Sequence, residues 1–282
     1  MGYRERFLVK PGHRVRLNRI DPAYAGDLDS AEAAKGETER YRQQLVQCQP
    51  LLWAESKRSV LIVLQGMDAS GKDGVVNHVL SALNPHGAKV VSFRAPTREE
   101  ADHDFLWRIH HYTPAKGEFA IFNRSHYEDV LHPRVHKLIG KDECETRYRR
   151  IRAFEATLVD AQTVVLKFML HISKEEQLRR FATRLDDPHR NWKISEGDYA
   201  EREFWDDYMH AFETALAATS TKTAPWFVIP SDHKWFRNLA VSQIIAEAVE
   251  ALPMSYPRPV IDLRVIRRKY HAALKQEKRA RR

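Results

Sequence analysis

The hydrophobic pattern of the chain alternates between short continuous apolar runs and longer segments with helical periodicity. Continuous apolar runs that end at glycine, proline or polar residues are typical of strands buried on both faces of a sheet. Five such runs occupy 59–66, 88–96, 117–125, 163–173 and 224–232. Apolar residues three and four apart predict helices over 30–56, 75–83, 99–112, 142–160, 174–185, 198–219 and 234–252. Strands separated by helices predict an α/β fold: a doubly wound, mainly parallel five-stranded sheet with helices on both faces.

Two basic segments lie outside this alternation. We expect residues 1–56 to form a basic arm and a helix that pack on the core, and residues 57–255 to form the core domain. Residues 256–282 form a basic tail, which we interpret as a solvated, partly frayed helix. A contact of this tail with a polyanion is the alternative interpretation.

Composition and charge narrow the class of protein. The 282 residues are 43% hydrophobic and contain no run of about 18 apolar residues, so no membrane span is expected. Only two cysteines occur, which favours a reducing compartment, and we expect the cytoplasm. The net charge of +8 favours an anionic partner, but charge alone does not choose among nucleic acid, a nucleotide, a membrane surface or an inorganic polyanion.

The segment LQGMDASGKDG, which covers 64–74, matches most of a P-loop. In such a loop, glycines let successive backbone N–H groups converge on a phosphate at a helix N-terminus. Asp73 stands where a P-loop has a metal-binding hydroxyl, and Asp68 lies inside the loop. We predict a phosphate site formed by Gly66, Ala69, Ser70, Gly71, Lys72, Asp73 and Gly74. The alternative is a glycine-rich turn with a surface lysine.

A second polar cluster, NRSHYED, covers 123–129 at the carboxyl end of the third predicted strand. In doubly wound sheets, ligands collect at that edge. We expect Arg124 to bind phosphate, and Asn123 and Glu128 to contact a nucleotide. Asp129 or Glu128 also has the chemistry to hold Mg²⁺. The alternative for both acidic residues is a helix start that complements the helix dipole.

A third cluster predicts a phosphate-binding lid at about 180–200. Arg180 and Arg184 lie four residues apart, so they share one helix face, and Arg190 and Lys193 follow in an irregular stretch. Basic segments of this kind close over phosphates in nucleoside-phosphate kinases and exclude water. We expect Trp192 to pack in the core or the lid, with stacking on a base or an arginine as the alternative.

The histidines give no convincing metal spacing. His110 and His111 are adjacent, and His132 and His136 have no obvious cysteine or acidic partner in the sequence. We therefore interpret these histidines as ordinary.

Taken together, GMDASGKDG, FNRSHYEDVL and RLDDPHRNWKIS resemble the polyphosphate kinase 2 family, over about 14–252. The resemblance implies a P-loop kinase fold like that of thymidylate kinase. It also implies polyphosphate as phosphoryl donor to adenine or guanine nucleotides, Mg²⁺ dependence with Mn²⁺ as a substitute, and a homo-oligomer (dimer or tetramer). Carried over by position, it implies catalytic roles for Asp68, Lys72 and Arg124, and an essential Arg184.

One departure bears on the substrate and on the metal. Members that act chiefly on nucleoside diphosphates tend to carry DRSWYNR where this chain has NRSHYED. The NRSHYED version goes with members that phosphorylate monophosphates, or both mono- and diphosphates. Since Asn123 replaces the strand-end aspartate, we assign the metal to Asp68 and Asp129.

The expected activity is reversible transfer of a terminal phosphoryl group from polyphosphate to AMP or ADP. Two alternatives remain at this stage: an ATP-dependent nucleoside monophosphate kinase, and a non-catalytic polyanion binder. No nucleic-acid-binding module is visible, so nucleic acid is not the expected partner.

Overall fold

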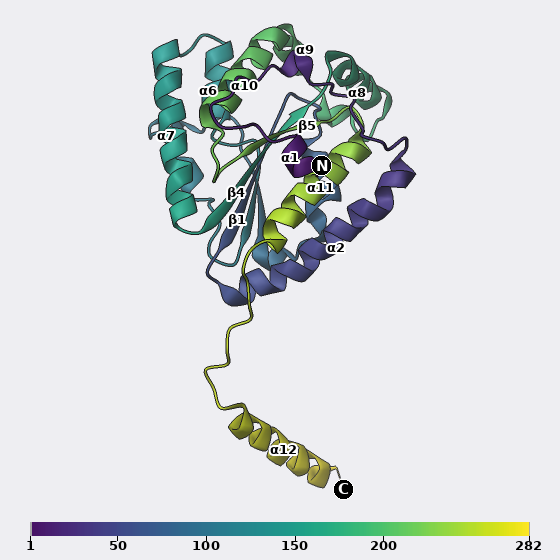
Figure 1. The fold of residues 1–282 in the computed structure, drawn as a ribbon, viewed down its shortest axis with the longest axis vertical. Helices are drawn as coiled ribbons and strands as arrows, with labels where there is room; N and C mark the ends of the chain where they lie inside the picture. Colours follow the sequence, from purple (N-terminus) through teal and green to yellow (C-terminus); the bar gives the residue numbers. More distant parts are fainter. Residues whose placement is uncertain (1, 282) are drawn as a thin grey trace.

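The computed structural model describes residues 2–281 and centres on a five-stranded sheet (Figure 1). All of its strands are parallel, and their order across the sheet is β2-β3-β1-β4-β5. The strands are β1 (Ser59–Gln65), β2 (Ala88–Ser92), β3 (Phe119–Asn123), β4 (Thr163–His171) and β5 (Trp226–Pro230). The predicted doubly wound sheet is confirmed, and each strand lies within the apolar run that predicted it.

Helices cover both faces of the sheet (Figure 1). Successive residues of β1 contribute to two separate cores, because side chains alternate across a strand: Leu61 and Val63 on one side, Ile62 and Leu64 on the other. One face carries α2 (Ala31–Glu55), α3 (Lys72–His78) and α11 (Lys234–Glu250). The other face carries α6 (Glu128–Val135), α7 (Lys141–Asp160) and α10 (Trp205–Thr219).

Shorter elements connect these layers. The α-helices among them are α1 (Tyr3–Arg6), α4 (Arg98–Ala101), α5 (Trp107–His110), α8 (Lys174–Asp186) and α9 (Glu196–Glu203). The 3₁₀ turns are η1 (Leu17–Arg19), η2 (Leu80–Ala82), η3 (Pro85–Gly87) and η4 (Asn191–Lys193). The helix α12 (Leu263–Ala280) follows α11 near the end of the chain.

Three predicted helices are each divided in the structure. The helix expected over 75–83 is α3 and the 3₁₀ turn η2, which are separated at Val79. The helix expected over 99–112 is α4 and α5, separated where the Asp104 carboxylate accepts the Leu106 N–H at 3.0 Å. The helix expected over 198–219 is α9 and α10, interrupted at Phe204. Trp205 is buried at the start of α10, whereas α9 buries no residue, so the two halves pack on different surroundings.

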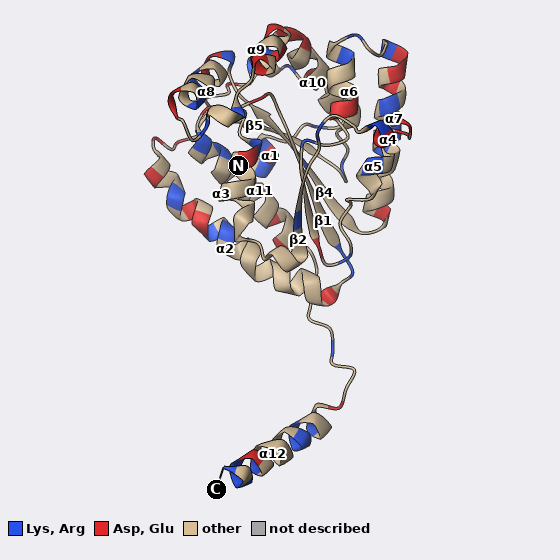
Figure 2. Cartoon of the chain, turned by 180° about the vertical axis from the view of Figure 1, so that it is seen from behind, with Lys and Arg blue, Asp and Glu red and all other residues tan. Residues whose placement is uncertain are grey.

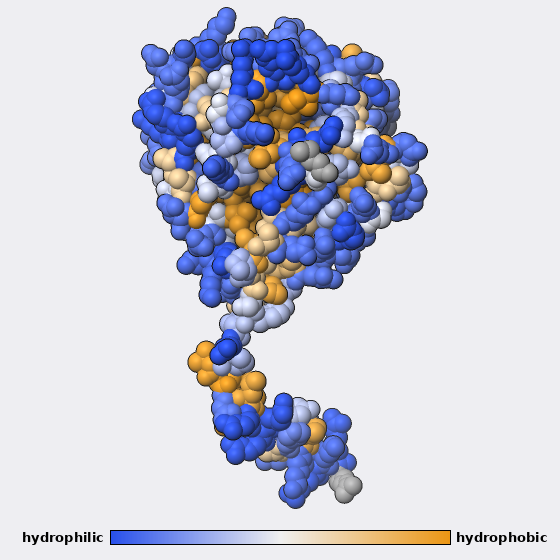
Figure 3. Space-filling model, viewed as in Figure 1, coloured by the Kyte–Doolittle hydropathy of each residue, from blue (hydrophilic) through white to orange (hydrophobic). Residues whose placement is uncertain are grey.

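The N-terminal segment packs on the core, whereas the C-terminal helix does not. Near the N-terminus, Tyr3, Phe7 and Tyr24 pack their rings against Phe236 of α11, and Leu8 forms an antiparallel bridge with Phe227 of β5. At the other end, α12 projects away from the body and carries mostly basic charge (Figures 1 and 2). Apolar side chains are exposed where the chain leads into α12, including Val260 and Ile261 (Figure 3). No helix within residues 2–281 is long and apolar enough to cross a membrane.

Candidate active site

The predicted phosphate loop lies between β1 and α3, at the carboxyl end of the central strand. Two glycines give the loop its shape: Gly66 has φ +148° and Gly71 has φ +107°, in the region that favours glycine. Ala69 shares this left-handed conformation with φ +62°. The helix begins at Lys72, and its first N–H groups have no partner within the helix. These N–H groups suit a phosphate oxygen.

Side chains from two other helices hold the carbonyl oxygens of this loop. From α8, Gln177 donates to the Asp68 oxygen at 3.0 Å, and Arg180 donates to the oxygens of Ala69 and Ser70 at 2.8 and 3.1 Å. From α11, Arg237 donates to the Ser70 oxygen at 3.4 Å. Fixing the carbonyl oxygens fixes the peptide planes, so the N–H groups keep one orientation.

Arg180 therefore braces the loop. Its remaining donors go to Glu176 and to the carbonyl oxygens of Ser231 and Asp232, so all five N–H groups have protein partners. This geometry does not favour the direct phosphate contact that the sequence suggested for Arg180, and that contact stays a prediction.

Arg237 is a site residue that the sequence reasoning missed. Its side chain is 2% exposed, and burial together with the neighbouring Arg180 lowers its pKa to about 9. A Cβ at Gly71 would lie 1.7 Å from its Nη1, and a Cβ at Gly74 would lie 2.5 Å from its Nη2. The two glycines thus make room for a buried arginine behind the phosphate loop.

Three charged side chains meet in front of the loop. Arg124 donates to the Asp68 carboxylate at 2.7 Å, and its Nη1 lies 3.9 Å from the Glu128 carboxylate. Arg124 has φ +62°, an unusual conformation for a non-glycine residue, at the point where the chain leaves β3. Burial lowers the pKa of Arg124, but Glu128 and Asp68 raise it by more, so the guanidinium stays charged. Burial raises the pKa of Glu128, against the opposing effect of Arg124.

Lys72 and Asp73 lie next to this group. The Lys72 ammonium is nearly buried and donates to the carbonyl oxygens of Gly66 and Met67 at 2.7 and 3.2 Å. Burial and the nearby Arg124 lower its pKa below the ordinary value. Asp73 accepts a hydrogen bond from Asn123 at 2.7 Å and lies 3.6 Å from the Lys193 ammonium. Asp73 thus links the end of β3, the phosphate loop and the segment predicted to be a lid.

Asp129 lies apart from this group. Its carboxylate accepts from Arg108 of α5 at 3.0 Å, and its carbonyl oxygen accepts from Arg147 of α7 at 2.6 Å. Burial raises its pKa despite the arginine. The structure brings Asp68 together with Glu128 rather than with Asp129, so the metal role of Asp129 stays a prediction.

A buried ionic network fixes the segment that carries Arg124. Glu155 of α7 pairs with Lys167 of β4 at 2.5 Å and accepts from the Tyr127 hydroxyl at 2.8 Å. The His126 ring nitrogen lies 3.3 Å from the same carboxylate. His126, Tyr127 and Lys167 are fully buried, and Tyr127 packs against Trp226. His126 and Tyr127 are therefore anchored in the core. Because Arg124 and Glu128 lie close to them on either side in the sequence, this anchoring fixes their positions.

The segment predicted as a lid runs from the end of α8 through η4 into α9. Arg184 donates to the Lys193 carbonyl oxygen at 2.9 Å, and Arg190 pairs with Asp187 at 2.8 Å. Trp192 is 77% exposed, with the Lys193 ammonium 4.9 Å from its ring centroid. Trp192 therefore does not pack in the core, and its contacts are within the predicted lid, where its Nε1 also donates to the His189 carbonyl oxygen at 3.0 Å.

The donor set in front of the loop fits a hard divalent cation. Asp68 and Glu128 both present carboxylate oxygens beside the phosphate cradle, which is the ligand type that Mg²⁺ prefers. In this structure Arg124 balances their charge.

Comparisons with known proteins agree on one family. The family model described as polyphosphate kinase 2 matches residues 28–256. A Meiothermus ruber protein named AMP/ADP-polyphosphate phosphotransferase is 47% identical over 259 residues, covering 90% of this chain and 96% of that protein. A Rhodopseudomonas palustris protein named ADP-polyphosphate phosphotransferase is 44% identical over 269 residues, covering 90% of this chain and 92% of that protein.

Among solved structures, the crystal structure of polyphosphate kinase 2 from Arthrobacter aurescens TC1 matches with a TM-score of 0.92 and 40% identity. The match covers 96% of this chain and 97% of that chain. The match to the family model extends over the phosphate loop, the segment after β3 and the predicted lid. The chain belongs to the polyphosphate kinase 2 family.

Proposed function

We propose that this protein transfers the terminal phosphoryl group of inorganic polyphosphate to AMP or ADP, in a reversible reaction. The observation that carries the proposal is the pairing of Asp68 with Arg124 at 2.7 Å in front of a braced phosphate loop. The P-loop pattern G-x-x-x-x-G-K-[ST] leaves the position of Asp68 open and has a hydroxyl where this chain has Asp73, so a carboxylate on each side of Lys72 has to be accounted for. The names of the M. ruber and R. palustris relatives support polyphosphate and adenine nucleotides as substrates.

Each residue of the site has a role that follows from its position. The N–H groups from Gly71 to Gly74 bind oxygens of the transferring phosphate, and Lys72 and Arg124 balance the charge that its oxygens carry during transfer. Arg184 and Lys193 of the predicted lid bind polyphosphate and exclude water. Asn123 and Glu128 orient the nucleotide.

The acceptor needs no strong general base. Its attacking atom is a phosphate oxygen, whose second pKa is about 6, so it is largely deprotonated at neutral pH. This differs from kinases whose acceptor is a hydroxyl group, in which a carboxylate accepts the proton. Asp68 is therefore a positioning and metal-binding group.

Mg²⁺ would be held by Asp68 and Glu128, with Asp129 as a more distant candidate and Mn²⁺ as a substitute. Bound there, it supplies positive charge between the carboxylates and the two polyanionic substrates. Without such charge, a carboxylate inside a phosphate site would repel both substrates.

An assay of both donors tests the proposal. The full chain is incubated with Mg²⁺ and AMP, ADP or GDP in turn, with either polyphosphate or ATP as donor, and the products are separated by chromatography. We expect phosphorylated nucleotide with polyphosphate. Transfer to AMP from ATP but not from polyphosphate would instead identify an ATP-dependent monophosphate kinase. Binding of polyphosphate without any transfer would identify a non-catalytic polyanion binder.

We further propose that the protein acts in the cytoplasm as a homo-oligomer, either a dimer or a tetramer. Light scattering coupled to size-exclusion chromatography measures the mass directly. A single-chain mass across the working concentration range would reject the oligomer.

A further inference from the structure

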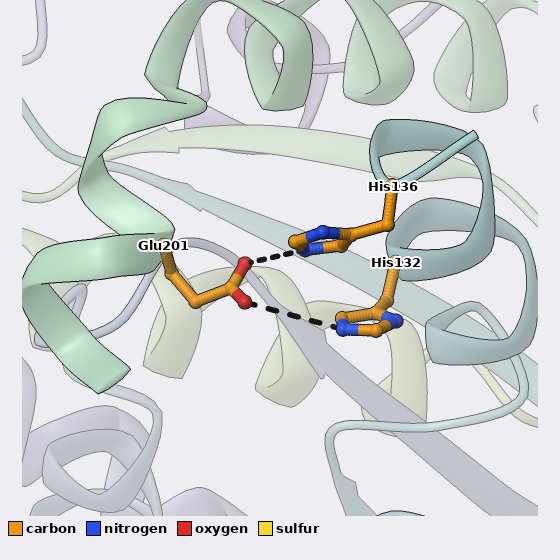
Figure 4. A group of neighbouring side chains, drawn as sticks. All are labelled: His132, His136 and Glu201. Carbon is orange, nitrogen blue, oxygen red and sulfur yellow. Dashed lines mark hydrogen bonds and ion pairs between the residues drawn. The ribbon is translucent and has the colours of Figure 1, made fainter. Parts of the chain in front are cut away.

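Two histidines and a glutamate meet beside the active site, at the junction of α6 and α9 (Figure 4). His132 lies on α6 and His136 caps its carboxyl end, one and two turns beyond Glu128. Both rings point toward the carboxylate of Glu201 on α9 (Figure 4). The Nε2 atoms of His136 and His132 lie 3.0 and 4.0 Å from its two oxygens. One ligand atom from each residue lies within 4.8 Å of the other two.

Neighbouring groups hold this arrangement in place. The Tyr208 hydroxyl donates to Glu201 Oε2 at 2.6 Å, which fixes the orientation of the carboxylate. The centroids of the two imidazole rings lie 4.3 Å apart, and the centroid of the Phe204 ring lies 4.7 Å from that of His136. The site therefore has a hydroxyl group that orients the Glu201 carboxylate and an aromatic ring packed beside one histidine. Both features are typical of metal sites.

The spacing suits a small divalent ion. Zinc bonds to histidine nitrogen and carboxylate oxygen are about 2.0–2.2 Å long, so tetrahedral ligand atoms lie roughly 3.3 Å apart. His136 Nε2 lies 3.0 Å from Glu201 Oε2 and His132 Nε2 lies 4.0 Å from Oε1, and one ligand atom from each residue lies within 4.8 Å of the others, so the set must contract slightly to hold one ion. The side chains of His132 and Glu201 are partly exposed, so they have room to rotate toward a common ion.

We propose that His132, His136 and Glu201 form a binding site for a divalent transition-metal ion, with Zn²⁺ as the best fit and water at the fourth position. Two imidazoles favour Zn²⁺, Co²⁺ or Ni²⁺ over Mg²⁺, which prefers all-oxygen ligands. The site is therefore distinct in chemistry from the carboxylates of Asp68 and Glu128.

An ion at this site would join two elements that are far apart in the sequence. Glu201 lies 65 residues beyond His136, on α9, the helix in which the predicted lid ends. His132 and His136 belong to the helix that begins at Glu128, within the active site. A bound ion therefore fastens α9 to the helix that carries an active-site carboxylate, and it restricts movement of the predicted lid.

Equilibrium dialysis against Zn²⁺ tests the site. The chelator-treated full chain is dialysed at about pH 7.5 in excess Mg²⁺, which occupies the carboxylates of the active site. We expect one high-affinity Zn²⁺ per chain. His132→Ala, His136→Ala and Glu201→Gln should each weaken binding about tenfold or more, and Tyr208→Phe should weaken it less. His271→Ala, an exposed histidine on α12, is the matched control and should bind as the wild type does.

Two further readouts locate the ion. Co²⁺ at the site should give visible absorption typical of four- or five-coordinate geometry, and His132→Ala should lose it. Hydrogen exchange of 196–203 should slow when Zn²⁺ binds the wild type but not when it is added to His132→Ala. Asp68→Asn should keep wild-type Zn²⁺ affinity. The proposal is overturned if the wild type binds no Zn²⁺, if the three ligand variants bind it equally well, or if Asp68→Asn abolishes binding.

Discussion

At the scale of single residues, the proposed mechanism depends on the orientation of Arg124. Its guanidinium has donors directed at Asp68 and Glu128, and its backbone adopts a left-handed conformation immediately after β3. The buried network around Glu155 anchors the two residues that follow Ser125, so the direction of Arg124 is set by the core. The charge is thus held in a fixed place before substrates bind.

Arg124→Lys should lower kcat/KM about 10- to 100-fold, because lysine keeps the charge but loses the planar fork of donors. Thermal unfolding should stay close to that of the wild type, since the side chain is 41% exposed. Steady-state kinetics with polyphosphate and ADP measure the effect, and Arg98→Lys on the exposed surface of α4 is the control. Wild-type kinetics in Arg124→Lys would contradict the proposed role.

His171 should make stability depend on pH. Burial lowers the pKa of this ring at the end of β4, whereas the unfolded chain takes up its proton near the ordinary value of about 6.5. The unfolded state therefore binds more protons as pH falls below about 6.5. The folded state therefore loses stability as the pH falls from about 6.5 to the lower pKa that His171 has in the folded state. Within that range the free energy of unfolding falls by up to about 1.4 kcal/mol per pH unit.

His171→Gln should remove this component while leaving a side-chain N–H that can reach the Ile20 carbonyl oxygen, which lies 3.2 Å from the histidine Nε2. Urea unfolding of both proteins between about pH 8 and pH 5 gives the difference in the free energy of unfolding. The curves should converge as pH falls. Parallel curves would show that His171 does not titrate differently in the folded and unfolded states.

At the scale of elements, the strands and the phosphate loop were predictable because their signals are local. A continuous apolar run such as 59–66 is favourable only as a strand buried in the middle of the sheet. The two glycines and the lysine of the phosphate loop form a motif within a few residues. The divided helices were not predicted, because apolar spacing continues through Asp104 and Phe204 while the partners of each half change. The spacing of apolar residues does not reveal that the two halves of a helix pack against different parts of the protein.

The site residues that the sequence missed all depend on distant contacts. Arg237 lies 167 residues beyond Ser70, and Lys167 joins Glu155 only through the fold. The pair His132 and His136 had a visible helical spacing, but its acidic partner, Glu201, was not identifiable. Long-range pairs of this kind require the arrangement of the helices around the sheet.

The close approach of Arg237 to the loop predicts that Gly74→Ala lowers both stability and activity. The added methyl group displaces the guanidinium from the Ser70 carbonyl oxygen, at a cost of about 1–3 kcal/mol. Gly36→Ala is the matched control: Gly36 lies in the second turn of α2 with nothing near its Cβ position, and the change should stabilise by up to about 1 kcal/mol.

A double-mutant cycle then tests the cause. In an Arg237→Gln background, Gly74→Ala should cost less stability than it does alone, because the shorter side chain leaves space for the methyl group. Equal costs in both backgrounds would mean that Arg237 does not require the glycine.

At the scale of the whole molecule, α12 is separate from the catalytic body. None of its residues is buried, and it projects beyond the end of α11 (Figure 1). A chain ending at residue 256 should therefore keep wild-type kcat and melting temperature, measured by kinetics with ADP and by thermal unfolding. A large rise in KM for polyphosphate would instead show that the basic helix binds the polyanion. A loss of oligomer mass in light scattering would show that α12 joins subunits.

We propose above all that Asp68, Lys72 and Arg124 promote phosphoryl transfer from polyphosphate to a nucleotide. The most direct measurement follows labelled terminal phosphate from polyphosphate into ADP, with wild type and Asp68→Asn compared at equal folded concentration. Asp207→Asn, an exposed carboxylate on α10, serves as the control. We predict labelled ATP from the wild type and the control, and a loss of about 100-fold or more in Asp68→Asn. Unlabelled product from the wild type, or wild-type transfer by Asp68→Asn, would contradict the account.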